Sequence, residues 1–152
     1  MGPQPAVVFD LDGVLSDAAG RQHFLDGEGG RARDWKGFFA ACGDDPVIEE
    51  VATLLGLLDP ALVVVLLTAR PDWVAPQTLA WLERYDLRWD VLIMRAHGDH
   101  TYARGFKRAI VAELRAFGFD LRLAFEDDQR NVDMFRAEGL PCLYIHSGYD
   151  FT

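Results

Sequence analysis

The stretch AVVFDLDGVL, residues 6–15, joins an apolar run to two aspartates that are one residue apart. The run VVF (7–9) has the composition of a buried strand, and Asp10 and Asp12 follow where that strand is expected to end. Two carboxylates held this close disfavour each other's ionisation unless a cation or a proton lies between them. We therefore expect this pair to bind a cation or to take part in acid–base chemistry.

Short apolar runs of this kind alternate along the chain with segments of helical period. The runs are VVFDL (7–11), LVVVLL (62–67), DVLIM (90–94), LRLAF (121–125) and PCLYI (141–145). Helices are expected between them, at residues 46–58, 74–85, 105–117 and 130–138. This alternation predicts an α/β fold with a doubly wound, mostly parallel, five-stranded sheet of Rossmann type. In such sheets, ligands bind beyond the carboxyl ends of the strands, where the strand order switches.

The 152 residues are expected to form a single domain, long enough to bury a core. The interval 13–45 is expected to be a loop or a short flap inserted after the first strand. Within it, GEGG (27–30) precedes DWKGFFAAC (34–42), which has the pattern of a short amphipathic helix. No segment is long enough for a large cap, so we expect a minimal cap or none, and an open site.

The net charge of −9 argues against a broad basic face for duplex nucleic acid, although a small cluster of arginines can still bind one phosphate. The longest apolar run, ALVVVLL (61–67), is too short to span a bilayer, and the N-terminus lacks a signal core. We therefore expect a cytoplasmic protein with no membrane partner. Cys42 and Cys142 have no metal-ligand spacing and are expected to be reduced structural thiols.

Polar side chains also lie near the ends of the other strands. They are Thr68 and Arg70 in LLTAR, Lys107 in GFKRAI, and Glu126, Asp127 and Asp128 in FEDD. Each has a simpler interpretation: a threonine caps a turn, a lysine is solvated, an acidic group complements a helix dipole, and Asp-x-Asp-Gly forms an Asx turn. Their order, and their shared place at one edge of the sheet, favour phosphoryl transfer through an aspartyl phosphate instead.

That chemistry needs each of these types of residue. A carboxylate attacks phosphorus poorly while both groups are negatively charged, and a bridging Mg²⁺ removes the repulsion. A hydroxyl and an ammonium group hold the remaining phosphate oxygens, where charge accumulates in the transition state. A second carboxylic acid protonates the leaving alcohol and later deprotonates the attacking water.

These motifs resemble those of the haloacid dehalogenase (HAD) superfamily of phosphohydrolases, and the resemblance covers nearly the whole chain. It implies that Asp10 is the nucleophile and Asp12 the general acid and base, with Thr68 in the second motif and Lys107 in the third. It also implies a Mg²⁺ site made by Asp10, by the backbone carbonyl of Asp12 and by the acidic fourth motif. The side chain of Asp12 is then expected to be free to transfer a proton.

The fourth motif, FEDDQRNVDMF (125–135), is similar to the superfamily's pattern in two ways. In one, Asp127 binds the metal and Asn131 replaces a second acid. In the other, Glu126 and Asp127 share the metal. Asp127 is common to both and is our first choice, Glu126 is the second, and Asp128 is expected to cap the following helix.

A closer likeness is to the 3′-phosphatase domain of bacteriophage-type polynucleotide kinase/phosphatases. It rests on VVFDLDGVLSDAAGR (7–21), on TAR (68–70) and on the fourth motif. Arginines of that family match Arg21 and Arg70, and both are expected to bind phosphate oxygens in a bidentate way that lysine would not. The likeness implies a Mg²⁺-dependent phosphomonoester hydrolase, with a polynucleotide 3′ end as substrate. No GxxxxGK[ST] pattern occurs, so we expect no kinase half in this sequence.

Two other functions remain open. One is a nucleotidase or another small-molecule phosphatase, acting on a free nucleotide. The other is a receiver-type phosphoacceptor module, which is disfavoured because its acceptor aspartate follows the third strand, where this chain has Met94 and Arg95. His97 and His100 in HGDH lack a third zinc ligand, and the aromatic residues of WKGFF (35–39) either stack on a base or pack the flap.

Overall fold

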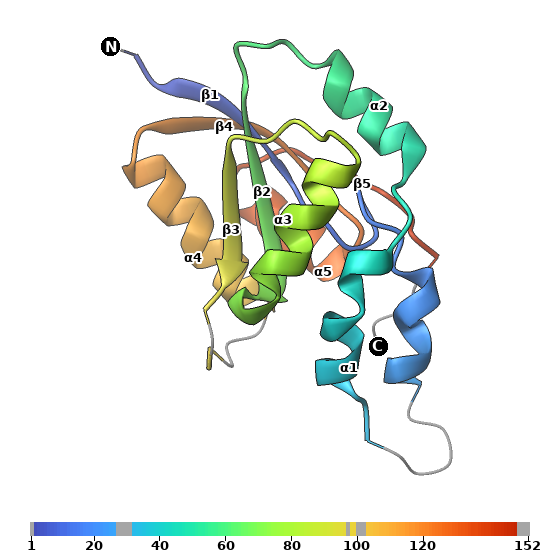
Figure 1. Ribbon diagram of the computed structural model, residues 1–152. Helices are drawn as coiled ribbons and strands as arrows, with labels where there is room; N and C mark the ends of the chain where they lie inside the picture. Colours follow the sequence, from blue (N-terminus) through green and yellow to red (C-terminus); the bar gives the residue numbers. More distant parts are fainter. Residues whose placement is uncertain (1, 27–31, 97, 100–102, 149–152) are drawn as a thin grey trace.

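A five-stranded sheet with the strand order β3-β2-β1-β4-β5 forms the centre of the structure, and every neighbouring pair of strands is parallel. The strands are β1 (Gln4–Phe9), β2 (Val63–Pro71), β3 (Val91–Arg95), β4 (Phe119–Glu126) and β5 (Cys142–Tyr144). The computed structural model describes residues 2–26, 32–96, 98–99 and 103–148 (Figure 1). The chain adds β2 and β3 on one side of β1, then β4 and β5 on the other, so the strand order switches between β1 and β4.

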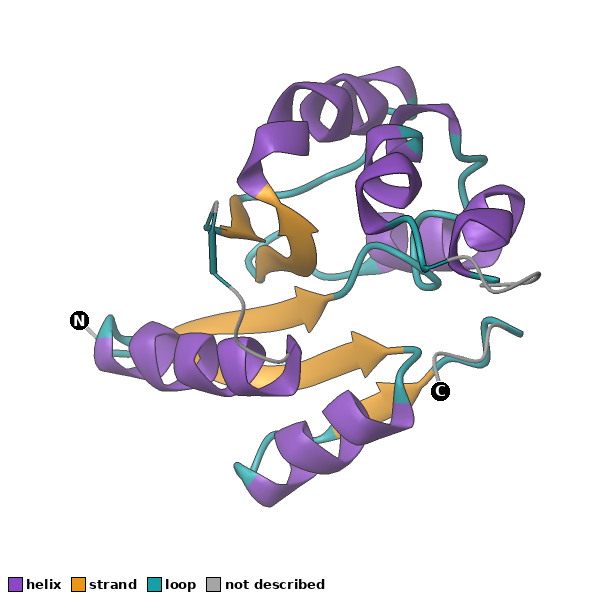
Figure 2. Cartoon of the chain, turned by 90° about the horizontal axis from the view of Figure 1, so that it is seen from below, coloured by secondary structure: helices purple, strands orange, loops and turns teal. Residues whose placement is uncertain are grey.

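Helices cover both faces of the sheet, which Figure 2 shows as a layer between them. One face packs against α4 (Ala103–Ala116) and α5 (Gln129–Ala137), and the other against α2 (Glu49–Leu57) and α3 (Ala75–Arg84). Side chains of β1 alternate between the two cores, with Ala6 and Val8 in the first and Val7 and Phe9 in the second. Burial on both faces explains why VVF (7–9) in β1 and VVVLL (63–67) in β2 are continuous apolar runs in the sequence.

The α/β fold and the parallel five-stranded sheet expected from the sequence are confirmed. The ends of the elements differ: β1 ends at Phe9, before the predicted Leu11, and β2 continues to Pro71, well past its apolar run. Leu11 is fully buried in the loop after β1, so its apolar character does not mark a strand residue. Gly139, with φ +75°, ends α5 in the left-handed conformation that a helix-ending glycine adopts.

In the described part of the insert between Gly13 and Asp45, residues 13–26 and 32–45, the helical segments are η1 (Ala19–Leu25), α1 (Trp35–Ala40) and η3 (Cys42–Asp44). Asp34 caps α1 by accepting a hydrogen bond from the backbone N–H of Gly37 at 2.9 Å. η1 and α1 lie side by side beyond the carboxyl ends of the strands (Figure 1). The short helix expected within 34–42 is α1, whereas the GEGG segment lies outside the described residues.

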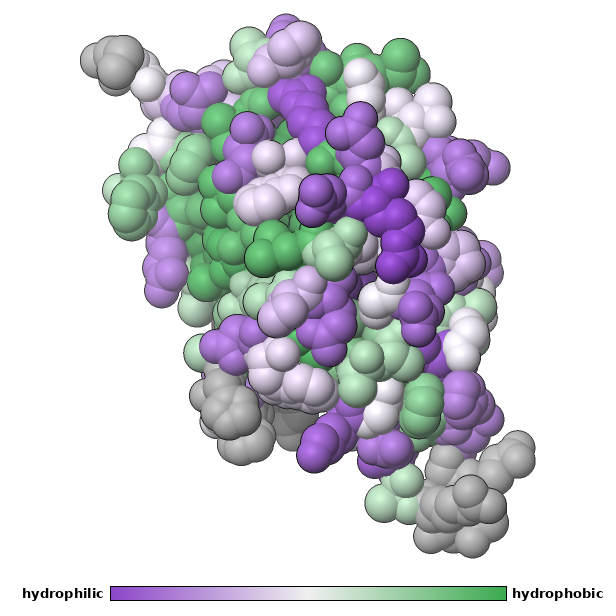
Figure 3. Space-filling view, in the orientation of Figure 1, coloured by the Kyte–Doolittle hydropathy of each residue, from purple (hydrophilic) through white to green (hydrophobic). Residues whose placement is uncertain are grey.

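β3 is one edge of the sheet, and all five of its residues are partly exposed. Figure 3 shows apolar side chains gathered on the surface near β3.

In the part of the chain that the structure describes, no helix is both long enough and apolar enough to cross a membrane. Cys42 and Cys142 are both buried, free thiols.

Candidate active site

The expected functional side chains gather at the carboxyl edge of the sheet, around the switch between β1 and β4. Asp10 directly follows β1, and its backbone N–H donates to the carbonyl oxygen of Phe125 in β4 at 3.1 Å. Glu126 ends β4, and Asp127 comes next. Because parallel neighbours end at the same edge, three carboxyl groups that are far apart in the sequence meet there.

Asp10, Glu126 and Asp127 form a buried carboxyl cluster, in which one oxygen of each lies within 4.8 Å of the others. Lys107, from α4, reaches this cluster with its Nζ 3.2 Å from Asp10 Oδ1 and 3.0 Å from Glu126 Oε2. Asn131 Nδ2 donates to the other oxygen of Glu126 at 2.9 Å. Lys107 is only 2% exposed, so it is not the solvated lysine of the simpler interpretation.

Three carboxyl groups face one ammonium group in this cluster, and the excess of negative charge shifts their pKa values. Burial and the charge of Asp10 raise the pKa of Glu126 to about 8. Burial and the charges of Asp10 and Glu126 raise the pKa of Asp127 to about 9. Burial alone would lower the pKa of Lys107, but the charges of Asp10 and Glu126 outweigh it and raise this pKa. The cluster therefore favours the binding of a further cation.

The carboxyl cluster fits a hard divalent cation. Asp127 Oδ2 is buried and has no hydrogen-bond partner among the described residues, which is costly for a carboxylate unless a cation compensates. Gly13 leaves room beside it, since a Cβ at that position would lie 2.0 Å from Asp127 Oδ2. Closely spaced carboxylate oxygens are ligands that suit Mg²⁺. Asp10 and Asp127, with Glu126 beside them, are thus placed to hold such an ion.

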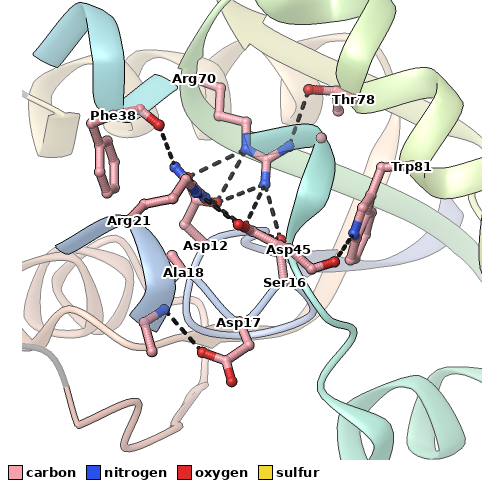
Figure 4. A network of polar contacts seen from close by, with 12 residues as sticks. Asp12, Ser16, Asp17, Ala18, Arg21, Phe38, Asp45, Arg70, Thr78 and Trp81 are labelled. Atoms are coloured by element: carbon pink, nitrogen blue, oxygen red, sulfur yellow. Dashed lines mark hydrogen bonds and ion pairs between the residues drawn. The ribbon is translucent and has the colours of Figure 1, made fainter. Parts of the chain in front are cut away.

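The side chain of Asp12 is not in the carboxyl cluster, because two arginines bind it elsewhere (Figure 4). Its Oδ1 lies 2.6 Å from Arg21 Nη2 and 2.7 Å from Arg70 Nη2. Burial raises the pKa of Asp12, but the charges of Arg70 and Arg21 outweigh burial and hold this pKa at about 2. The side chain that is expected to be free to transfer a proton is thus bound by both arginines in this structure, and its function in proton transfer stays a prediction.

Arg21 and Arg70 reach Asp12 from different elements, Arg21 from η1 in the insert and Arg70 from β2. Both are almost fully buried. The sequence predicts that they bind phosphate oxygens; in this structure, they are brought together around the proposed acid–base residue. The insert therefore contributes the guanidinium group of Arg21 to the site that the strand ends form.

Asp45, Ser16 and Thr78 belong to the same network, and sequence reasoning missed all three. Asp45 accepts hydrogen bonds from Arg21, and Ser16 Oγ donates to Asp45 Oδ2 at 2.6 Å. Thr78 Oγ1 accepts from Arg70 Nη1 at 3.1 Å. A buried arginine has five N–H groups to satisfy, so further acceptors near both arginines could have been anticipated, although not which residues supply them.

The other expected residues are placed as follows. Thr68 is buried in β2, and its Oγ1 accepts a hydrogen bond from the backbone N–H of Arg70 at 3.1 Å. Asp128 caps α5, as expected, by accepting from a first-turn backbone N–H at 2.9 Å. His97 and His100 lie outside the described residues.

Of the aromatic residues in WKGFF, Phe38 packs inside the insert. It is buried, its ring centroid lies 4.4 Å from the guanidinium carbon of Arg21, and its carbonyl oxygen accepts from Arg21 Nη1 at 3.0 Å. Trp35 is 45% exposed and packs edge-on against Phe38. Packing of the flap is therefore the better interpretation for Phe38.

The family model described as polynucleotide kinase PNKP phosphatase domain matches residues 4–151. Among solved structures, a chain of the Pnkp1/Rnl/Hen1 complex is 26% identical with a TM-score of 0.79, and the match covers 94% of this chain and 46% of that one. This chain thus spans less than half the length of that relative.

Two further solved structures are similar in fold. The class C acid phosphatase from Bacillus anthracis with tungstate bound is 13% identical with a TM-score of 0.65, over 97% of this chain and 69% of that one. A putative phosphatase from Clostridium difficile is 14% identical with a TM-score of 0.64, over 98% of this chain and 87% of that one. At these identities, the likeness supports the fold alone.

Proposed function

Because this chain belongs to the polynucleotide kinase phosphatase-domain family, and so to the HAD-type phosphatases, we propose that it is a Mg²⁺-dependent polynucleotide 3′-phosphatase that works through a phosphorylated Asp10. One observation carries the mechanism: Asp10 lies at the switch in strand order, beside Lys107 and the carboxyl groups of Glu126 and Asp127. A nucleophile, a fixed ammonium group and oxygen ligands for a metal meet there, as phosphoryl transfer to a carboxylate requires.

In the first step, a carboxylate oxygen of Asp10 forms a bond to phosphorus, and the bond between phosphorus and the ester oxygen breaks. Asp12 gives its proton to the leaving oxygen. In the second step, a water oxygen attacks the phosphorus of phosphorylated Asp10, while Asp12 takes a proton from that water. The bond between Asp10 and phosphorus breaks, and inorganic phosphate leaves. Asp10 is then a carboxylate again and Asp12 carries the proton taken from water, which it releases to solvent when it binds Arg21 and Arg70 again.

Asp12 has to change partners before it donates a proton, because Arg21 and Arg70 hold its pKa at about 2. We propose that the phosphate of a substrate competes with Asp12 for Arg70, which binds it through Nε and Nη2, and for Arg21, which binds it through Nη2. Once the arginines turn to the phosphate, burial raises the pKa of Asp12. Binding of the substrate thus prepares the acid that the first step needs.

A bound Mg²⁺ would supply positive charge that offsets the repulsion of the nucleophile and the phosphate. The proposed ligands are Asp10, the backbone carbonyl of Asp12, and Asp127, with Glu126 as second choice. Glu126 is already bound by Lys107 at 3.0 Å and by Asn131 at 2.9 Å. Asp127 Oδ2 has no such partner in the described residues, which favours Asp127.

The family supports a nucleic acid end as the substrate, and so does the size of the insert. The described residues of the insert form short helical segments, and a phosphate on a long chain can enter a site without a large cap. The similar Pnkp1 chain belongs to an assembly called an RNA repair complex. By analogy, we propose that this protein acts on a phosphorylated polynucleotide end, in the cytoplasm.

The test compares phosphate release from an oligonucleotide with a 3′ phosphate, the same oligonucleotide with a 5′ phosphate, and free nucleoside 3′-monophosphates. We expect the first to be preferred by at least about tenfold in kcat/KM and its hydrolysis to stop when EDTA removes Mg²⁺. Equal or faster hydrolysis of free nucleotides would make the protein a nucleotidase. A stable phosphoprotein without turnover would instead support the receiver-type module.

A further inference from the structure

Asp45 binds Arg21 in a bidentate contact that orients the whole guanidinium group. Its Oδ1 accepts from Arg21 Nε at 2.8 Å, and its Oδ2 accepts from Arg21 Nη2 at 2.6 Å. The carbonyl oxygen of Phe38 accepts from Nη1 at 3.0 Å, and Asp12 Oδ1 accepts from Nη2 at 2.6 Å. A contact of this fork-like kind fixes both the position and the plane of the guanidinium group.

Asp45 is in turn held by the core of the protein. Its backbone carbonyl accepts a hydrogen bond at 2.7 Å from Nε1 of Trp81, a fully buried residue of α3. Its Oδ2 accepts from Ser16 Oγ at 2.6 Å, and Asp45 is only 4% exposed. Asp45 therefore connects Arg21 in the insert to α3 and to the loop after β1.

Asp12, Arg21, Asp45 and Arg70 form an arginine–carboxylate cluster with two charges of each sign (Figure 4). Arg70 Nη2 lies 3.8 Å from Asp45 Oδ2, so Arg21 is the closer partner of Asp45. In the mechanism above, Asp12 leaves the arginines when a phosphate binds. Asp45 is then the carboxylate that remains on Arg21, since its own contacts do not involve Asp12.

We propose that Asp45 is a positioning residue for phosphate binding: it keeps the Arg21 guanidinium directed at the phosphate while Asp12 exchanges partners. The inference rests on the proposed function of Arg21 as a phosphate ligand. Asp45 acts through Arg21 and does not contact the substrate. Replacing the Asp45 carboxylate therefore weakens phosphate binding more than it destabilises the fold. The backbone carbonyl of Asp45 keeps its hydrogen bond to Trp81 when the side chain changes.

The test compares Asp45→Asn with the matched control Asp44→Asn, an exposed neighbouring aspartate. For Asp45→Asn, we expect the KM for a 3′-phosphorylated oligonucleotide and the Ki for inorganic phosphate both to rise by about tenfold. Asp44→Asn stays within about twofold of the wild type in both constants. Circular dichroism and thermal unfolding confirm that each variant is folded.

A double variant separates positioning from a general structural effect. In the Arg21→Ala background, Asp45→Asn changes kcat/KM by less than about twofold if Asp45 acts through Arg21. Equal and additive losses in the two backgrounds, or an Asp45→Asn protein with wild-type KM and Ki, would overturn the proposal. A wild-type protein that hydrolyses no phosphate ester would instead reject the proposed function.

Ser16→Ala provides a second, milder variant in case Asp45→Asn does not fold. It removes the hydroxyl that donates to Asp45 Oδ2 and that also accepts from Arg70 Nη2 at 3.2 Å. We expect a rise of a few fold in KM and in the Ki for inorganic phosphate, with kcat changed less. Unchanged KM and Ki in a folded Ser16→Ala protein would contradict the positioning function.

Discussion

Nη2 of Arg70 lies 2.7 Å from Oδ1 of Asp12, so a proposed phosphate ligand is bound to the proposed proton donor. The N–H groups on Arg70 Nε and Nη2 that bind Asp12 cannot give the same hydrogen bonds to a phosphate at the same time. Phosphate binding and protonation of Asp12 are therefore coupled in the proposed mechanism. Arg21, which approaches the same oxygen from the insert at 2.6 Å, extends this coupling to a second element.

Asp12→Asn is expected to separate binding from turnover. In the wild type, the Asp12 carboxylate competes with phosphate for Arg21 and Arg70. The neutral amide competes less, so the Kd for inorganic phosphate falls by a few fold. Hydrolysis falls by about 100-fold or more, because an amide neither donates the proton to the leaving group nor takes one from water. Isothermal titration with phosphate and steady-state kinetics measure the two effects. Weaker phosphate binding in the variant than in the wild type would contradict the proposed competition.

Asp10→Asn is expected to abolish hydrolysis while leaving the fold intact. The amide is not a nucleophile, so turnover drops by at least about 10³-fold, and no phosphoprotein forms with a ³²P-labelled substrate. The change also removes one negative charge from the carboxyl cluster, where that charge raises the pKa of Glu126 and Asp127. In metal-free buffer at pH 8, its Tm should therefore equal or exceed that of the wild type. Substantial hydrolysis, or a large drop in Tm, would argue against Asp10 as the nucleophile of an intact site.

The residues at the carboxyl edge were predictable because each follows a recognisable apolar run. Asp10 and Asp127 come directly after buried strands, and in a parallel sheet such ends meet at one edge whatever their distance along the chain. Lys107 was placed there by its position in a motif, and its burial beside Asp10 agrees with that prediction. Local pattern and sheet topology were therefore sufficient for the carboxyl groups, whereas Lys107 required the family resemblance.

The arginine–carboxylate cluster was not predictable in the same way. Arg21 meets Asp45 across 24 positions through an insert without a regular pattern, and nothing in the sequence around Asp45 distinguishes it from Asp44. Asp12 is bound by both arginines across 9 and 58 positions of the sequence, and such long-range contacts follow from the fold rather than from a local pattern. Sequence motifs proposed Arg21 and Arg70 as phosphate ligands, and the structure adds the carboxylates of Asp12 and Asp45 that bind them.

The stability of the metal-free protein is expected to fall as the pH rises through the neutral range. Glu126 has a pKa of about 8 in the folded protein against 4.5 when unperturbed, and Asp127 about 9 against 3.8. The stability that these two carboxyl groups contribute is fully present below their unperturbed pKa values. It is lost as the pH rises through their pKa values in the folded protein. Asp12, whose pKa is lowered to about 2, contributes a constant amount of stability above pH 4. It therefore does not mask the loss of stability that Glu126 and Asp127 cause.

Thermal unfolding in EDTA and in Mg²⁺, from pH 5 to pH 9, measures this effect. We expect Tm to fall by about 5 °C or more across that range in EDTA, and by less in saturating Mg²⁺, because the ion binds the ionised carboxylates of the folded state. Asp127→Asn should flatten the curve in EDTA and reduce the stabilisation by Mg²⁺. A Tm that is independent of pH in EDTA would contradict the charge balance of the carboxyl cluster.

Gly13→Ala is expected to damage the metal site without replacing any charged residue. Gly13 has φ +82°, which costs an alanine about 1 kcal/mol or more, and its new Cβ would lie 2.0 Å from Asp127 Oδ2 and 2.5 Å from Asp127 Cγ. The carboxyl group of Asp127 must then move, so the Mg²⁺ concentration for half-maximal activity rises by about tenfold or more. Gly56→Ala is the matched control, because a Cβ at that position meets nothing within 4 Å. Gly56 lies in α2, where alanine in place of glycine stabilises the helix by about 0.5–1 kcal/mol. If both variants show the wild-type Mg²⁺ dependence, Asp127 is not the ligand whose space Gly13 preserves.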